Sequence, residues 1–269
     1  MNLSRRREKN LKHVIKNCRA QIDGVHFFGG DRRECLSLIA ERLRRGYTTA
    51  LYTPNPIMLE NAARDPEFRA LLRRAELNLP DGIGVVMAAR LLGEEISCRL
   101  SGVDMAKGVL ALAARKGYRV FLLGGKRGVA NEAARRLTAR LSGLCICGVR
   151  DGYFSKEETG EVLKEIRRAR PDILLVCLGS PKQEVWIDRY RGELVGVRLF
   201  MALGGTLDVF AGRVCRAPLQ VQKMGLEWLW RMLNEPKRLR ELPKMLAFTG
   251  RTLKNVVILH RLNKQKNPF

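Results

Sequence analysis

The chain has 269 residues, which is enough for one sizeable hydrophobic core with a small appendage, and its composition is that of an ordinary globular protein. It carries 50 Lys and Arg against 27 Asp and Glu, and this formal net charge of +23 favours phosphate-rich partners: nucleotide-sugars, anionic lipids or nucleic acids. Since no run of about 18 apolar residues and no signal-peptide h-region is present, we expect neither a membrane-spanning nor a secreted protein.

Strands and helices are predicted to alternate through the middle of the chain. Short apolar runs predict strands at 49–53, 77–79, 119–123, 144–149, 173–178 and 198–203. Helical patterns lie between them at 57–74, 83–92, 103–116, 128–141, 156–168 and 182–190, and Ser155 with Glu158 has capping-box spacing. Alternation of this kind is typical of an α/β protein with a Rossmann-like, mostly parallel sheet and helices on both faces.

The two ends of the chain differ from the middle. Residues 1–20 form a basic segment, and from Arg213 onward thirteen Lys and Arg face only Glu227, Glu235 and Glu241. Strand-like runs stop after residue 206, and helices are predicted at 219–233 and 236–260. We therefore divide the chain into the basic segment 1–20, a core at 21–206 and a helical appendage at 207–269. The appendage helices either lie on an anionic membrane or pack on the core or a neighbouring subunit.

Ligands of α/β sheets gather at the carboxyl ends of the strands, so the polar residues that follow each predicted strand are candidates. Residues 53–56 read Thr-Pro-Asn-Pro, which either faces the crevice with a hydroxyl and an amide or forms a rigid turn with a helix cap. Residues 80–84 read Pro-Asp-Gly-Ile-Gly. Asp81 is therefore either a carboxylate at the site or the N-cap of the next helix.

Two further junctions are rich in glycine. Residues 122–128 read Leu-Leu-Gly-Gly-Lys-Arg-Gly, a turn whose backbone N–H groups and helix start suit phosphate, although the spacing matches neither a dinucleotide fingerprint nor a P-loop. Residues 179–184 read Gly-Ser-Pro-Lys-Gln-Glu and offer amide and ammonium donors. A purely structural turn is the alternative at both places.

The sequence predicts neither a metal nor a cofactor. It has no Asp-x-Asp pair, and its seven cysteines are scattered without a CxxC pair, which favours free thiols in a reducing, cytoplasmic compartment. A leaving diphosphate would then be stabilised by cationic side chains and backbone N–H groups.

Six ordered blocks between about residues 25 and 240 together resemble the WecG/TagA/CpsF glycosyltransferases. The blocks are residues 53–56, 80–86, 99–104, 121–125, 179–184 and 225–228. The resemblance implies an inverting hexosyltransferase that acts in cell-envelope polymer synthesis, such as that of teichoic acid. It would move N-acetylmannosamine, or its uronic acid, from a UDP donor to the 4-hydroxyl of undecaprenyl-diphosphate-linked N-acetylglucosamine. It also implies a peripheral position on the inner face of the cell membrane.

The resemblance also implies roles for particular residues. Asp81 would be the general base, Thr53 would lie at the sugar-phosphate of the acceptor, and Arg231 and Arg238 would hold the diphosphate. Arg99 and Gln183 match pocket residues of the family. The other substrate-binding candidates in these blocks are Asn55, Asp104, Gly124, Gly125 and Gly179. Glu241 departs from the expected pattern, because a basic residue is expected there.

Other functions remain open at this stage. The alternative is a basic Rossmann-like protein that binds another nucleotide or a nucleic acid, although no RRM, KH or helix-turn-helix signature is present. A nicotinamide-dependent oxidoreductase is disfavoured by the glycine spacing. Homo-oligomerisation through the appendage is also open.

Overall fold

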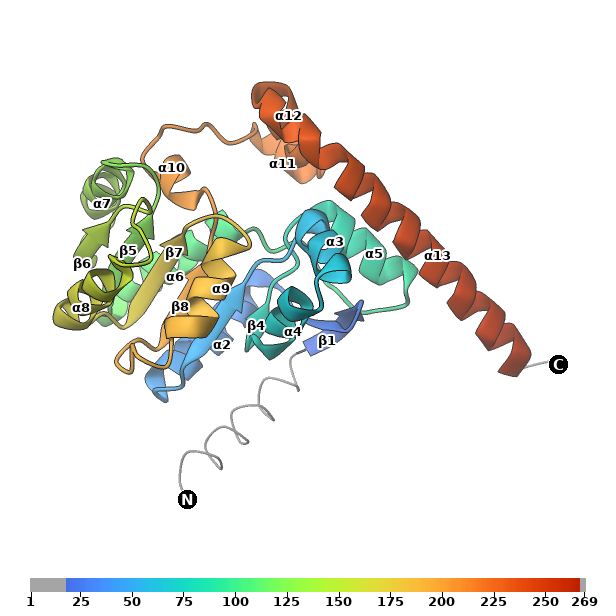
Figure 1. Ribbon diagram of the computed structural model, residues 1–269, viewed down its shortest axis with the longest axis horizontal. Coiled ribbons are helices and arrows are strands. Elements are labelled where there is room, and N and C mark those ends of the chain that lie inside the picture. Colours follow the sequence, from blue (N-terminus) through green and yellow to red (C-terminus); the bar gives the residue numbers. More distant parts are fainter. Residues whose placement is uncertain (1–17, 267–269) are drawn as a thin grey trace, which may run out of the picture.

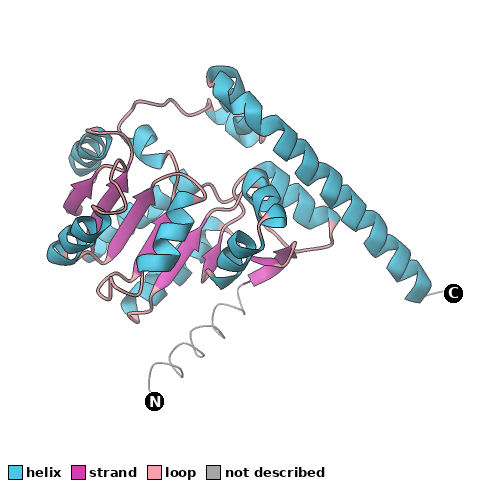
Figure 2. Ribbon diagram, viewed as in Figure 1, coloured by secondary structure: helices cyan, strands magenta, loops and turns pink. Residues whose placement is uncertain are grey.

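A computed structural model describes residues 18–266 of the chain. Its centre is a six-stranded parallel sheet in the order β4-β3-β8-β7-β5-β6 (Figures 1 and 2). The strands are β3 (Thr49–Tyr52), β4 (Leu77–Asn78), β5 (Arg119–Gly124), β6 (Cys145–Arg150), β7 (Ile173–Cys177) and β8 (Leu199–Ala202). Each corresponds to a predicted strand, so the predicted α/β fold with a Rossmann-like parallel sheet is confirmed.

Helices cover both faces of this sheet, and each face has its own hydrophobic core. Along β7, Ile173 and Leu175 point into one core while Leu174 and Val176 point into the other, because successive side chains of a strand face opposite sides. One core is closed by α2 (Arg32–Arg44), α6 (Gly102–Lys116), α7 (Val129–Arg140) and α10 (Thr206–Phe210). The other is closed by α3 (Pro56–Arg64), α4 (Pro66–Arg74), α5 (Ile83–Leu91), α8 (Thr159–Ala169) and α9 (Lys182–Tyr190).

Three elements before β3 were not predicted from the sequence, and one predicted helix is in fact two helices. The antiparallel hairpin β1 (Cys18–Ile22) and β2 (Val25–Phe28) precedes α2, and neither the hairpin nor α2 was expected. The predicted helix 57–74 breaks into α3 and α4 at Asp65. Pro66 lacks the N–H that would continue α3, and the Asp65 side chain accepts hydrogen bonds from the first amides of α4.

The appendage consists of α11 (Leu219–Lys223), α12 (Glu227–Asn234), the 3-10 helix η1 (Pro236–Glu241) and α13 (Leu242–Lys266). The predicted helix 219–233 is interrupted at Gly225, whose φ of +76° is incompatible with a continuous helix. Helix α10, which lies in the stretch predicted as appendage, packs against α7 in the core. The basic segment before Cys18 lies outside the described residues.

Helix α13 runs across α3 and α5 (Figure 1). Arg251 fixes it there: its guanidinium bonds to the Asp23 carboxylate at 2.9 Å and to the Glu60 carboxylate. Lys244 adds a hydrogen bond to Asn61 at 2.9 Å. In the part of the chain that the structure describes, no helix is both long enough and apolar enough to cross a bilayer.

Candidate functional site

The polar junctions predicted from the sequence lie side by side along the carboxyl edge of the sheet. Following the strand order from β4 to β5, the edge carries Asp81, Thr53, Gly204, Gly179 and Gly124. Parallel strands place all their carboxyl ends at one edge, which is where α/β proteins bind their ligands. Among residues 18–266, two of the hollows lie along this edge.

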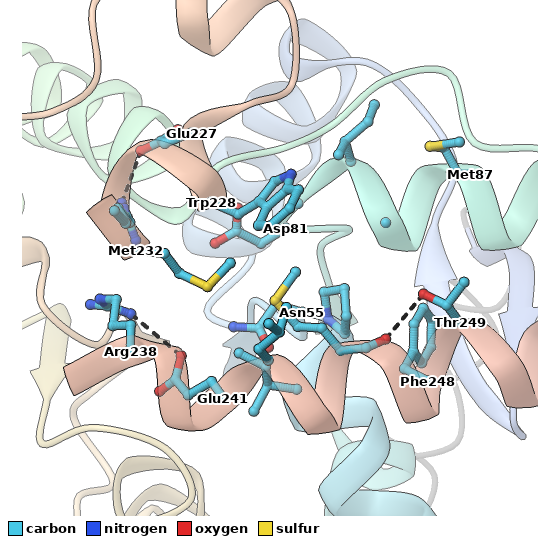
Figure 3. A pocket seen from close by; sticks show the side chains of 18 of the residues that line it. Asn55, Asp81, Met87, Glu227, Trp228, Met232, Arg238, Glu241, Phe248 and Thr249 are labelled. Atoms are coloured by element: carbon cyan, nitrogen blue, oxygen red, sulfur yellow. Dashed lines mark hydrogen bonds and ion pairs between the residues drawn. The ribbon is translucent and has the colours of Figure 1, made fainter. Parts of the chain in front are cut away.

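The first hollow lies between the edge and the appendage, has a volume of about 340 Å³, and is called the Asp81 pocket below (Figure 3). The core contributes the loops around Asn55, Asp81 and Arg99, together with α5. The appendage contributes α12, η1 and the first turns of α13. The pocket therefore exists only because α12 and α13 close over the sheet edge. Its charged lining residues are Asp81, Arg99, Glu227, Arg231, Arg238 and Glu241.

Asp81 is half-buried in this pocket and is not a helix cap. The N-cap of α5 is Gly82, and no side chain caps that helix, so the N-cap interpretation of Asp81 was wrong. Burial raises the pKa of Asp81 from 3.8 to about 6, although the charges of Arg231 and Arg99 and a hydrogen bond from the Gly102 amide oppose that rise. A carboxylate with such a pKa is ionised at neutral pH and able to accept a proton.

Glu227, in the first turn of α12, is the centre of a charge network that joins appendage to core. Its carboxylate contacts Arg99 of the core at 3.1 Å, Arg231 at 2.9 Å and Arg216 at 3.4 Å. Arg216 in turn holds Asp104 of the core at 2.6 Å. Partial burial would raise the pKa of Glu227, but the Arg231 and Arg216 charges outweigh it and lower the pKa overall. The network fastens α12 over Asp81.

The three acids of the basic tail all pair with arginines. Glu227 binds as described, and Arg238 contacts Glu235 at 2.8 Å and Glu241 at 3.8 Å. No role was predicted for Glu227 from the sequence. It is one of only three acidic residues in the basic tail, and that isolation could have marked it as a partner of arginines. The arginines that line the pocket thus have carboxylate partners, which an anionic ligand could replace.

Asn55 has both of the roles that its motif allowed. Its side chain accepts a hydrogen bond from the Met58 amide at 3.0 Å and so caps α3, and it also lines the Asp81 pocket. The interpretation of residues 53–56 as a rigid turn with a helix cap was therefore correct, and Asn55 also lies in the pocket wall.

Three predicted site residues lie beside the pocket rather than in its wall. Thr53 is buried and its hydroxyl donates to the Ala202 carbonyl at 3.3 Å. Asp104 is engaged by Arg216 on the linker to the appendage. Gln183 is buried, and its carboxamide accepts from the Gly204 amide at 2.8 Å and donates to Glu184 at 2.7 Å. Gln183 therefore holds the loop after β8 in place.

The second hollow, called the Gly125 cleft, has a volume of about 690 Å³ and lies at the ends of β5 and β7. Its lining includes Gly125, Lys126, Tyr153, Phe154, Lys182 and Asp208. The Lys182 ammonium lies 5.4 Å from the centre of the Phe154 ring. The cleft combines lysines, aromatic rings and a glycine-rich turn before a helix, a combination suited to a phosphorylated ligand with a flat ring.

Two predicted glycines do not line this cleft but are the chain neighbours of Gly125 and Leu178, which do. Gly124 has a φ of +127°, and a Cβ there would lie 2.2 Å from the Cys177 carbonyl oxygen, so a larger residue does not fit. Gly179, with a φ of +78°, turns the chain between β7 and α9 at the exposed end of the edge. Among residues 18–266, no three His, Cys, Asp or Glu side chains gather as metal ligands would.

The chain is similar to proteins of one known family. A family model described as "Glycosyl transferase WecG/TagA/CpsF family" matches residues 20–262. A protein of Bacillus spizizenii (strain ATCC 23059 / NRRL B-14472 / W23) is 36% identical over 205 residues, covering 76% of this chain and 79% of its own. A protein of Bacillus subtilis (strain 168) is 37% identical over 195 residues, covering 71% and 75%. Both relatives are named N-acetylglucosaminyldiphosphoundecaprenol N-acetyl-beta-D-mannosaminyltransferase.

Proposed function

Because the chain belongs to the WecG/TagA/CpsF family of glycosyl transferases, we propose that it transfers N-acetylmannosamine, or its uronic acid, from a UDP donor. The acceptor is the 4-hydroxyl of N-acetylglucosamine carried on undecaprenyl diphosphate, in line with the names of the two relatives. The enzyme is a hexosyltransferase, and we place its reaction at the inner face of the cell membrane, in cell-envelope polymer synthesis such as that of teichoic acid.

The observation that carries this proposal is the composition of the Asp81 pocket. One cavity brings together a carboxylate with a pKa of about 6 and the guanidinium groups of Arg99, Arg231 and Arg238. A lipid-linked sugar diphosphate needs a base beside its hydroxyl and cations beside its phosphates. Arginine suits the second task because its planar fork binds phosphate oxygens in pairs.

We assign the UDP donor to the Gly125 cleft. Lys126 and Lys182 supply charge for the diphosphate, and Tyr153 and Phe154 supply surfaces for the base. Four strand spacings separate β4 from β5, so Asp81 and the cleft lie roughly 19 Å apart along the edge. An extended nucleotide-sugar can bridge much of that distance, with its sugar directed toward Thr53 and Asp81.

The proposed reaction is a single displacement. Asp81 takes the proton of the acceptor hydroxyl while that oxygen forms a bond to the anomeric carbon of the donor. The bond from the anomeric carbon to UDP breaks on the opposite face, so the configuration inverts. Lys126 and Lys182 stabilise the negative charge on the departing diphosphate. Thr53 takes part from the neighbouring strand if its hydroxyl turns away from Ala202.

We further propose that the appendage rests on the anionic membrane that carries the acceptor. Exposed apolar side chains on α12 and η1, among them Leu229, Leu233 and Leu239, alternate with basic residues. Each Lys or Arg near an anionic surface contributes about 1 kcal/mol to such binding. Self-association through the same helices, as a homo-oligomer, is the competing use of this surface.

The direct test is an assay of UDP release. UDP-N-acetylmannosamine and its uronic acid are offered separately with a short-chain lipid acceptor, and one of them is expected to release UDP. Asp81→Asn should lower turnover by at least about a hundredfold, as expected for a lost general base. Near-normal turnover in a folded Asp81→Asn variant would contradict the role of Asp81, and no release with either donor would contradict the donor assignment.

A further inference from the structure

The Gly125 cleft contains a carboxylate that the proposed reaction does not use. Asp208, in the first turn of α10, lines this cleft together with Lys126 and Lys182, and it is the one acid in the lining that the described residues form. In the part of the chain that the structure describes, its carboxylate takes part in no hydrogen bond and no ion pair. By contrast, Asp104 is held by Arg216 at 2.6 Å. The Asp208 carboxylate is therefore available to a ligand.

The turn that carries Asp208 is held in place without its side chain. The Gly204 amide donates to the Gln183 carboxamide at 2.8 Å, and the backbone carbonyl of Asp208 accepts from the Arg213 amide at 2.9 Å. The Asp208 carboxylate lies beside this turn, since a Cβ added to Gly205 would be 3.9 Å from its Oδ2. The carboxylate is thus positioned at the carboxyl end of β8.

The groups along the sheet edge follow the order of the parts of a nucleotide-sugar. From β6 inward, the edge carries the aromatic rings of residues 153 and 154 and then Lys126 after β5. Lys182 after β7 and Asp208 after β8 follow. The Lys182 ammonium reaches back to 5.4 Å from the centre of the residue 154 ring, so its charge lies on the aromatic side of Asp208. With the base at the rings and the diphosphate at the lysines, the sugar of the donor comes next, at Asp208.

The far side of Asp208 leads to the proposed base. Strand β8 is two strand spacings, roughly 10 Å, from β4, which ends before Asp81. A sugar at Asp208 therefore lies between the diphosphate site and the place where the acceptor hydroxyl would meet Asp81. This is the position that the single displacement requires of the donor sugar.

We propose that Asp208 accepts hydrogen bonds from ring hydroxyls of the donor's sugar. This rests on the proposed function, because it takes UDP to lie in the Gly125 cleft. A carboxylate repels phosphate, which excludes the diphosphate as its partner, whereas the hydroxyls of a sugar can donate to it. N-acetylmannosamine and its uronic acid differ only at the exocyclic carbon and share their ring hydroxyls, so Asp208 positions either sugar.

Binding calorimetry with two uridine probes tests this role. One probe is UDP-N-acetylmannosamine, and the other is UDP methylated on its terminal phosphate, which carries the same charge but no sugar. Loss of the negative charge in Asp208→Asn affects both probes alike, so the ratio of their affinities reports the sugar contact. A hydrogen bond to a charged group changes affinity by about tenfold or more, so this ratio should fall by about tenfold in Asp208→Asn.

Two variants in the same region serve as controls. Lys126→Gln should weaken both probes by the same factor, because both carry the diphosphate. Asp151 accepts a hydrogen bond from the Tyr153 amide at 3.0 Å and does not line the cleft, so Asp151→Asn should leave the ratio unchanged. Binding of the methyl probe by Asp208→Asn also shows that this variant is folded.

The outcomes separate the sugar contact from the proposed reaction. Equal losses for the two probes in Asp208→Asn assign the carboxylate to the uridine and overturn the inference, even if UDP is released. An unchanged ratio in Asp208→Asn, or a wild type that binds both probes equally, also overturns it. A ratio that falls only in Asp208→Asn, without UDP release to any acceptor, supports the sugar contact and overturns the proposed transfer. If the wild type binds neither probe, the donor assignment of the cleft fails and the inference fails with it.

Discussion

Asp81→Asn is expected to stabilise the fold at pH 8 while it removes activity. Burial raises the pKa of Asp81 from 3.8 to about 6, whereas the unfolded chain keeps the ordinary value. The folded state therefore binds this proton more tightly than the unfolded state. The resulting stability is fully present below about pH 4, is lost as the pH rises from about 4 to about 6, and stays lost above that.

The magnitude follows from the two pKa values. A tenfold change in proton affinity corresponds to about 1.4 kcal/mol, so the difference between 3.8 and about 6 corresponds to about 3 kcal/mol. Because Asp81 is only partly buried, we discount this to about 2 kcal/mol. Asn keeps an acceptor for the Gly102 amide and carries no charge, so the variant regains this energy at pH 8. In a chain of this size the melting temperature would rise by about 4 °C.

The measurement is a series of thermal unfolding scans of both proteins between pH 4 and pH 8. The difference in melting temperature should be small at pH 4 and grow toward pH 8. Asp104→Asn is the control of opposite sign. Partial burial alone would raise the pKa of Asp104, but the hydrogen bond and charge of Arg216 outweigh it, so the pKa is lowered overall. The ionised carboxylate therefore stabilises the fold at pH 8, and Asp104→Asn should lose that stability. A melting temperature for Asp81→Asn that is unchanged at pH 8, or a difference that does not vary with pH, would refute the reasoning.

Two further predictions concern the charge network and the glycine turn. Burial is the main cause of the raised pKa of Asp81; the Arg231 charge lowers this pKa and the Glu227 charge raises it. Glu227→Gln should therefore lower the pKa and move the acidic limb of the kcat/KM profile to lower pH. Arg231→Gln should raise the pKa and move the same limb to higher pH. If the acidic limbs of both variants lie at the same pH as that of the wild type, the charges on α12 do not affect the pKa of Asp81. Gly124→Ala should destabilise the fold by at least about 2 kcal/mol in urea unfolding, because its Cβ would overlap a β7 carbonyl in a strained conformation. Gly160→Ala, in open space on α8, is the matched control, and equal midpoints for the two variants would contradict the overlap.

Several elements and site positions could be predicted from the sequence because their causes are local. Short apolar runs predicted all six strands of the sheet, and the polar residues after them predicted which loops lie at the carboxyl edge. The spacing of Ser155 and Glu158 predicted reciprocal hydrogen bonds, and both are present, at 2.7 and 3.3 Å, although they close the turn before α8, which begins at Thr159 rather than at residue 156. In each case the signal in the sequence spans only a few neighbouring residues.

Helix α2 was not predicted although its local signals are present: Asp31 and Glu34 form a capping box, and Cys35, Leu38, Ile39 and Leu43 recur at helical spacing. The burial of Arg42 on this helix is not a local property: its side chain is almost fully buried, and its guanidinium donates to the Thr49 hydroxyl at the start of β3. Only the packed structure reveals that partner. The break at Asp65 could have been predicted from Pro66, since a residue before proline disfavours the helical conformation.

The sequence by itself determined the kinds of groups available: a carboxylate and glycine turns at strand ends, and a basic tail with three acids. Only the tertiary structure decided the spatial order of the strands, and with it that Asp81 and the Gly125 cleft lie at opposite parts of one edge. It also decided that Glu227, 128 residues away from Arg99, brings the appendage over Asp81. The physical reason is that strand order and long-range ion pairs depend on which surfaces pack together, and a sequence pattern reports only the faces that are available to pack.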